Sequence, residues 1–180
     1  ILRFAWRVRG RQDAPETLAR LAPSVIGFAG IPVDVPPGAF LQASAEGEAA
    51  IRDAVLAALP PAPGRKARIV ELYAGCGTLT FPLAAHARVE AFEGHPGALA
   101  ALVRASAGQR VDGFLRDLER QPVEAKELGA ALAVVLDPPH TGAGLQMTQI
   151  LDGKPPVVVY VSCSPRVLFR DAALLFKAGY

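Results

Sequence analysis

Cysteine is scarce in this chain, with only Cys76 and Cys163 among 180 residues. Two cysteines do not make a disulfide framework or a cysteine metal cluster, and we predict no metal site. The sequence has no secretory signal and no apolar run of membrane-spanning length, so we expect a soluble, cytoplasmic protein with no membrane partner. The formal net charge is only +2, and this small value argues neither for nor against a nucleic-acid partner.

Apolar residues, by contrast, make up 51% of the chain, which is ample for one packed domain with a small appendage. Apolar runs and helical periodicity alternate along the sequence. We expect strands at 69–73, 89–92, 111–115, 131–136 and 157–161, and helices at 44–59, 81–85, 98–107, 122–129 and 166–177. This alternation predicts an α/β fold with a parallel sheet, helices on both faces, and a site at the carboxyl ends of the strands.

The most informative stretch runs from the strand that ends at Tyr73 through a glycine turn to the next strand. Gly75 and Gly77 allow the backbone to turn sharply and leave room for a ligand. The following apolar run closes with Glu93, and an acid at the tip of the second strand is where a β-α-β nucleotide site binds ribose hydroxyls. The order of these elements predicts an adenosine cofactor. The less favoured alternative is a plain glycine turn beside a surface acid.

Residues 1–35 precede a boundary at Pro36-Pro37-Gly38 and are expected to form a small antiparallel β appendage, with the main domain at 36–180. Apolar and arginine residues alternate in the first strand, and further extended pieces are expected at 25–28 and 31–35. Trp6 and the arginines of the first twenty residues are compatible with RNA contact. We slightly prefer the alternative that these residues form the solvated face of an edge strand.

Three later strand ends carry polar side chains. Asp117 follows the third strand, where an acid can reach an adenine amino group, although a surface acid is an equal alternative. Asp137 begins a rigid Asp-Pro-Pro-His turn. Cys163 stands just before a helix whose N-terminus would favour the nucleophilic thiolate. For Cys76 we prefer the interpretation of a buried, inert thiol.

The chain also resembles a known family over roughly residues 36–180. The resemblance rests on Phe40-x-Gln42, Glu71-Leu-Tyr-Ala-Gly-Cys-Gly-Thr, Glu93, Asp137-Pro-Pro, Ser162-Cys-Ser-Pro and Arg170-Asp171, in that order. This combination resembles the catalytic domain of the RNA uracil-C5 methyltransferases. It implies the Rossmann-like, mostly parallel sheet of class I methyltransferases that depend on S-adenosylmethionine (SAM).

The resemblance implies SAM as cofactor and a uridine in rRNA or tRNA as substrate, with Cys163 as the nucleophile. A thiolate that adds to C6 of uracil makes C5 able to attack the sulfonium methyl group. The target uridine is expected to be single-stranded or flipped, because a paired base is inaccessible. Together with the glycine turn and the third strand, the expected cofactor-binding set is Gln42, Tyr73, Gly75, Gly77, Glu93, Asp117 and Asp137.

The sequence departs from the family in several places. The family usually has Cys at position 74, Asn at 164 and Arg at 140, where this chain has Ala74, Ser164 and His140. Family members also carry a His-Val-Glu segment whose Glu is the general base, and we expect that Glu beyond Tyr180, in a domain that is incomplete at its C-terminus.

Two alternative functions stay open. Asp-Pro-Pro turns followed by an aromatic residue also occur in N6-adenine methylation, and such an enzyme would not need Cys163. A non-catalytic SAM- or RNA-binding fragment would bind without turnover.

Overall fold

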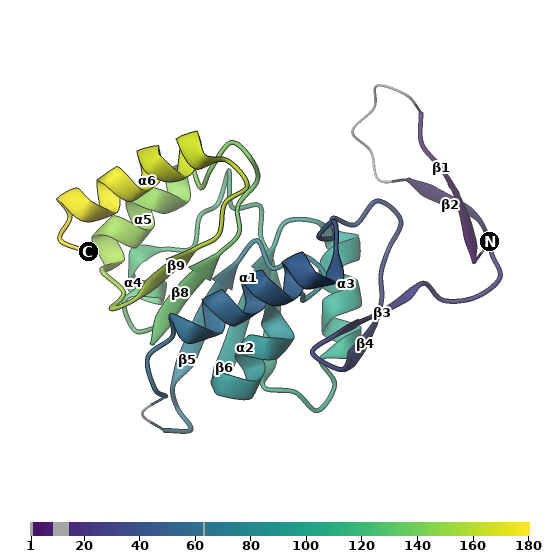
Figure 1. The fold of residues 1–180 in the computed structure, drawn as a ribbon, viewed down its shortest axis with the longest axis horizontal. Coiled ribbons are helices and arrows are strands. Elements are labelled where there is room, and N and C mark those ends of the chain that lie inside the picture. Colours follow the sequence, from purple (N-terminus) through teal and green to yellow (C-terminus); the bar gives the residue numbers. More distant parts are fainter. Residues whose placement is uncertain (1, 9–14, 63) are drawn as a thin grey trace.

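The computed structural model describes residues 2–8, 15–62 and 64–180, and its centre is a five-stranded sheet. The strands lie in the order β7-β6-β5-β8-β9 and all neighbours are parallel (Figure 1). Their bounds are β5 Arg68–Leu72, β6 Arg88–Glu93, β7 Val111–Leu115, β8 Ala133–Leu136 and β9 Val158–Tyr160. The order reverses between β5 and β8, and ligands bind outside the carboxyl ends of strands at such a switch point.

Both faces of the sheet are buried because apolar side chains follow one another along the strands. In β5, Ile69 packs with Val89 and Val135 on one face, whereas Val70 and Leu72 belong to the cluster on the other face. Burial is nearly continuous along β5 and β8, which explains why these central strands were recognisable from apolar runs.

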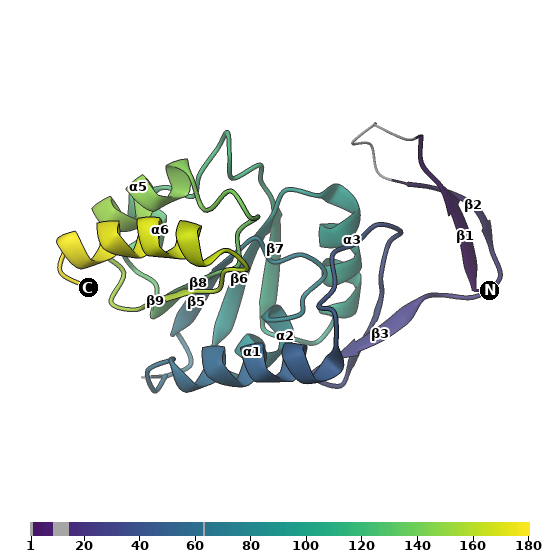
Figure 2. The same ribbon diagram turned by 45° about the horizontal axis from the view of Figure 1, so that its top comes forward.

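Helices cover both faces of the sheet (Figure 2). One face carries α1 (Ala45–Ala57), α2 (Thr80–His86) and α3 (Pro96–Ala105). The other carries α4 (Ala125–Leu128), α5 (Leu145–Gly153) and α6 (Pro165–Lys177). The predicted α/β class with helices on both faces is confirmed.

The segment before the sheet forms two separate antiparallel hairpins. Strands β1 (Arg3–Trp6) and β2 (Glu16–Arg20) make the first, and β3 (Val25–Phe28) and β4 (Ile31–Asp34) make the second. The second packs into the body, where Phe28 and Val33 are fully buried beside α3.

The first hairpin projects from the body near the N-terminus (Figure 1). Two of its arginines are engaged within the chain: Arg3 donates to the Val35 carbonyl oxygen at 2.7 Å, and Arg20 pairs with Asp34. These contacts give both arginines a role in tethering the hairpin, and the interpretation of the basic N-terminal segment as a solvated edge strand stays a prediction.

The structure corrects the expected elements in three places. Residues 2–8 and 15–35 contain two hairpins instead of one small sheet, and strand β2 was not predicted. Helix α5 was also missed, and the helix expected at 122–129 is reduced to the single turn of α4. The domain boundary after residue 35 remains a prediction. Among the described residues, no helix is long and apolar enough to cross a membrane.

Candidate active site

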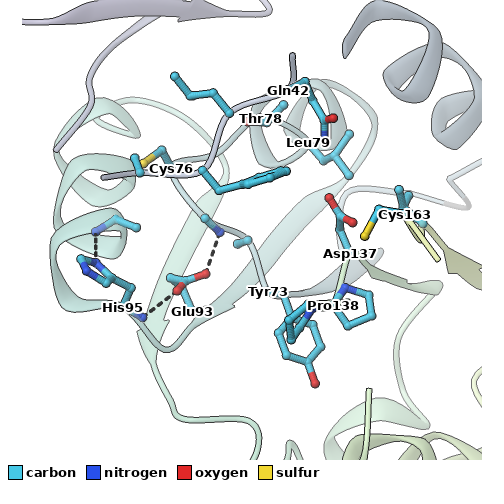
Figure 3. A pocket seen from close by; sticks show the side chains of 18 of the residues that line it. Gln42, Tyr73, Cys76, Thr78, Leu79, Glu93, His95, Asp137, Pro138 and Cys163 are labelled. Carbon is cyan, nitrogen blue, oxygen red and sulfur yellow. Dashed lines mark hydrogen bonds between the residues drawn. The ribbon is translucent and has the colours of Figure 1, made fainter. Parts of the chain in front are cut away.

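A cavity of about 630 Å³ opens at the carboxyl ends of β5, β6, β8 and β9. Six of the predicted site residues line it, although they come from four strand ends and from the segment before α1 (Figure 3). They are Gln42, Tyr73, Gly75, Glu93, Asp137 and Cys163. A cavity of this size falls within the range of small-molecule and cofactor sites.

The turn after β5 forms one wall of the cavity. Its backbone is left-handed at Tyr73 (φ 63°) and at Gly75 (φ 60°). A side chain built on Gly75 would have no other atom within 4 Å, so this glycine faces open space. Gly77 has a different role, because its Cβ would lie 2.5 Å from the Phe81 ring. Gly75 thus keeps the cavity open, whereas Gly77 lets α2 pack closely on the turn.

Glu93 is held in place by two backbone amides. Its Oε2 accepts the Gly75 N–H at 2.8 Å, and its Oε1 accepts the His95 N–H at 2.6 Å (Figure 3). His95 in turn caps α3, where its Nδ1 accepts the Ala98 N–H at 3.1 Å. A carboxylate has about four lone-pair sites, so Glu93 retains acceptor capacity on a fixed carboxylate beside the cavity.

Glu71 is a buried acid that the site prediction missed. It lines the cavity from within β5 and is only 2% exposed. Burial raises the pKa of its carboxyl to about 8, and the nearby carboxylates of Glu93 and Asp137 add to the shift. Within the described residues, its Oε2 atom and the Thr80 hydroxyl have no hydrogen-bond partner. An acid inside an otherwise apolar strand was the available signal for this residue.

Asp137 and Cys163 form the opposite wall, on the side of β8 and β9. Figure 3 shows both side chains on the same side of the cavity. Burial raises the pKa of the Asp137 carboxyl. The next residue, Pro138, is buried and also lines the cavity. The Asp137 carboxyl therefore stands on a rigid turn, beside an exposed thiol.

Two serines hold the backbone around Cys163. The Ser162 hydroxyl accepts the Ser164 N–H at 3.1 Å, and the Ser164 hydroxyl accepts the Val167 N–H at 3.4 Å as the N-cap of α6. Cys163 therefore lies directly before the helix N-terminus, as the sequence predicts. Arg170, on the same helix, is paired with Asp171.

The other thiol differs from Cys163. Cys76 is 3% exposed, and burial together with the Glu93 charge raises its pKa to about 11. Such a thiol holds its proton at neutral pH, which agrees with its interpretation as inert.

Two predicted binding residues do not reach the cavity wall. Gly77 and Asp117 are absent from the described residues that line it. Asp117 instead closes its own turn, where Oδ1 accepts the N–H groups of Glu119 at 3.1 Å and Arg120 at 3.3 Å. This geometry corresponds to the surface-acid alternative.

Comparison with known proteins gives relatives for most of the chain, although no family model matches it. The chain is 42% identical over 160 residues to a protein of Mesorhizobium japonicum named an uncharacterized RNA methyltransferase, covering 87% of this chain and 38% of that protein. It is 37% identical over 154 residues to the 23S rRNA (uracil(1939)-C(5))-methyltransferase RlmD of Halomonas elongata, covering 80% of this chain and 32% of that protein. The chain thus spans about a third of the length of these relatives.

A solved structure with the same fold is the tRNA (uracil-54, C5)-methyltransferase of Pyrococcus abyssi in complex with S-adenosyl-L-homocysteine. Its TM-score is 0.78 at 20% identity, and the match covers 96% of this chain and 44% of that one. The class I methyltransferase fold is confirmed. The resemblance to RNA methyltransferases is confirmed by the names of the relatives.

Proposed function

From its homology to RNA methyltransferases over most of its length, we propose that this chain is the SAM-dependent catalytic part of an enzyme that methylates C5 of uridine in RNA. One observation carries the proposal: a single cavity has the fixed Glu93 carboxylate on one wall and the exposed Cys163 thiol on the other. The first group suits a nucleoside cofactor and the second suits a covalent step.

The residues of the cavity fit SAM. Glu93 presents a carboxylate whose remaining lone pairs can accept hydrogen bonds from two ribose hydroxyls. Gly75 leaves the space above the turn free for a ligand. Gln42 and Tyr73 lie along the same cavity and complete the set that would hold the cofactor. Asp117 stays a weaker candidate, because its carboxylate is engaged in its own turn.

The acids that line the cavity also suit a positively charged ligand. They are Glu71, Glu93 and Asp137, and among the described residues Glu71 Oε2 has no hydrogen-bond partner. A cation would lower the free energy of their charged forms. Bound SAM supplies an electrophilic methyl group on a positively charged sulfur.

Cys163 would carry the covalent step on the RNA base. Its thiolate adds to C6 of uracil, forming a carbon–sulfur bond and moving the electron pair of the C5–C6 double bond onto C5 and the O4 carbonyl. C5 then accepts the methyl group. A general base must then remove the C5 proton, after which the C5–C6 double bond re-forms and the Cys163 sulfur leaves C6.

The uracil base of the RNA would enter from the open side of the cavity. Phe40 is 78% exposed and lines it, and Cys163 is exposed as well. A uridine that is single-stranded or flipped out of a stem can reach this side, whereas a paired uridine cannot. Both rRNA and tRNA are candidate substrates.

Because the general base is expected beyond Tyr180, the test is a methylation assay with the purified full-length protein, isotope-labelled SAM, and rRNA or tRNA from cells that lack the protein. Digestion to nucleosides should give labelled 5-methyluridine, and none with Cys163→Ala. Labelled N6-methyladenosine that survives Cys163→Ala would instead support the amino-methyltransferase alternative. Cofactor binding without any labelled nucleoside would support a binding-only role.

A further inference from the structure

Asp171, on the first half of α6, is a buried acid that neither the cofactor nor the covalent step uses. It is only 2% exposed. Its Oδ2 accepts the Tyr160 hydroxyl at 2.7 Å and the Ala143 N–H at 3.4 Å, and its Oδ1 accepts the Arg170 Nε–H at 2.7 Å. Burial by itself would raise the pKa of Asp171, but the hydrogen bonds from Arg170 and Tyr160 outweigh it and the pKa is lowered.

These three partners belong to different parts of the site. Tyr160 ends β9, three residues before Cys163. Ala143 lies in the loop that begins at Asp137. Arg170 reaches the same loop, because its Nη2 donates to the Thr141 carbonyl oxygen at 3.1 Å. Asp171 therefore connects β9, which leads to Cys163, with the loop that follows Asp137.

The loop is closely fitted to this acid. Gly142 has φ 93°, and its N–H donates to the Pro139 carbonyl oxygen at 2.8 Å. A Cβ on Gly142 would lie 2.7 Å from Asp171 Oδ2 and would also collide with Arg170. On the other side of the loop, the Tyr73 hydroxyl donates to the Ala143 carbonyl oxygen at 3.3 Å. The loop is thus held from both the turn after β5 and α6.

We infer that Asp171 is a positioning residue that fixes the Asp137 loop relative to Cys163 across the cavity. The inference rests on the proposed function. The thiolate, the uracil ring and the methyl donor react efficiently only when their reacting atoms are held close to the productive geometry, and a displacement of about 1 Å can cost about a hundredfold in rate. Asp171 and Tyr160 set this geometry without touching the substrate.

A purely structural role would have a different signature. If Asp171 only stabilised the docking of α6, its loss would lower the melting temperature and loosen the whole helix. A matched control is Glu90→Gln, which breaks another half-buried ion pair, with Arg68 at 2.5 Å. Arg68 is the first residue of β5, at the opposite end from the cavity.

The experiment compares the unmutated full-length protein with its Asp171→Asn, Tyr160→Phe and Glu90→Gln variants in steady-state methylation of a uridine-containing RNA. We expect Asp171→Asn to lower kcat about tenfold or more, with KM for RNA and Kd for S-adenosylhomocysteine within about twofold. Tyr160→Phe should lower kcat less, and it tests the inference if Asp171→Asn does not fold. Glu90→Gln should lower only the melting temperature. An unchanged kcat in both site variants would overturn the inference.

Hydrogen exchange gives a second readout that needs no turnover. In Asp171→Asn, the amides of Gly142 and Ala143 and those around Cys163 should exchange faster, with the core of α6 unchanged. If the unmutated protein forms no 5-methyluridine, the proposed function fails, and this measurement still decides on Asp171. Faster exchange along all of α6, or none in the loop, would show that Asp171 is structural only.

Discussion

The two walls of the cavity are built in different ways. On the β5–β6 wall, Glu93 is fixed by the backbone amides of Gly75 and His95, all within a short stretch of sequence. On the β8–β9 wall, Asp137 and Cys163 depend on side-chain contacts that begin on α6, through Asp171 and Tyr160. A wall that the backbone forms suits a constant ligand such as a cofactor. A wall held by side chains from a distance is more easily altered by a single substitution.

The largest effect should come from Cys163→Ala, which removes the reactive group of the β8–β9 wall. Turnover should fall to the level without enzyme, because the uracil ring is then not activated at C5. The affinity for S-adenosylhomocysteine, measured by calorimetric titration, should stay the same. A weakened cofactor affinity would show that the two walls are not independent.

Intact-protein mass spectrometry of the same variant sharpens this point. The unmutated protein, incubated with SAM and a uridine oligonucleotide, should show a covalent RNA adduct, and Cys163→Ala should not. An adduct that persists in the variant would remove Cys163 from the mechanism.

The second largest effect concerns Glu71, beneath the β5–β6 wall. Its pKa of about 8 in the folded protein lies above the ordinary value of 4.5, so the folded state binds more protons between these values. The stability that this adds is fully present below pH 4.5 and is lost as pH rises to 8, by about 1.4 kcal/mol per unit. Glu71→Gln should flatten the decline in the free energy of unfolding between pH 5 and 8. Equal slopes in denaturant titrations of both proteins would contradict this assignment.

A smaller effect is expected from Glu93→Ala, which removes the carboxylate of the β5–β6 wall. Hydrogen bonds to a charged group contribute about 1.5–3 kcal/mol, so Kd for S-adenosylhomocysteine should rise by roughly 10- to 150-fold. Calorimetric titration measures this change, and circular dichroism checks that the variant is folded. Unchanged affinity in a folded variant would rule out Glu93 as the ribose ligand.

The smallest effect should follow from Asp137→Asn on the other wall. The amide keeps the shape of the side chain and removes the charge, so the affinity for the cofactor or uracil should weaken by less than about tenfold, as for one ordinary hydrogen bond. The melting temperature should hardly change, because Asp137 is only partly buried. A large drop in melting temperature with intact binding would make Asp137 a structural residue of its turn.

The sequence predicted the elements that have a periodic or apolar signal and missed those that do not. All five residues of β2 are exposed, so it shows no alternation of buried and exposed positions. Helix α5 follows Gly144 with φ 51°, has no side-chain N-cap, and ends in Gly153 with Lys154 left-handed. The N-terminal end of α5 therefore lacks the usual signal of a helix start, although Gly153 and the prolines after Lys154 are typical of a helix end.

The same contrast holds for the site. Glu93, Asp137 and Cys163 were predictable because parallel strands bring their carboxyl ends to one edge of the sheet. The engagement of Asp117 in its own turn was not predictable, since nothing in the sequence separates a capping acid from a ligand acid. Asp171 was noticed only as part of a motif, because its partners Tyr160 and Ala143 are brought to it by the packing of α6.

The position of β5 at the centre of the sheet has a consequence for how the chain folds. Ile69 pairs with Val89, which is near in sequence, and on its other side with Ala133, which is far along the chain. Closing the longer loop costs more entropy, so the β5–β6 pair is expected to form first and the β5–β8 pair to be the slower event. The Glu93 wall would then form before the Cys163 wall docks, and the thiol would join the cofactor site late in folding.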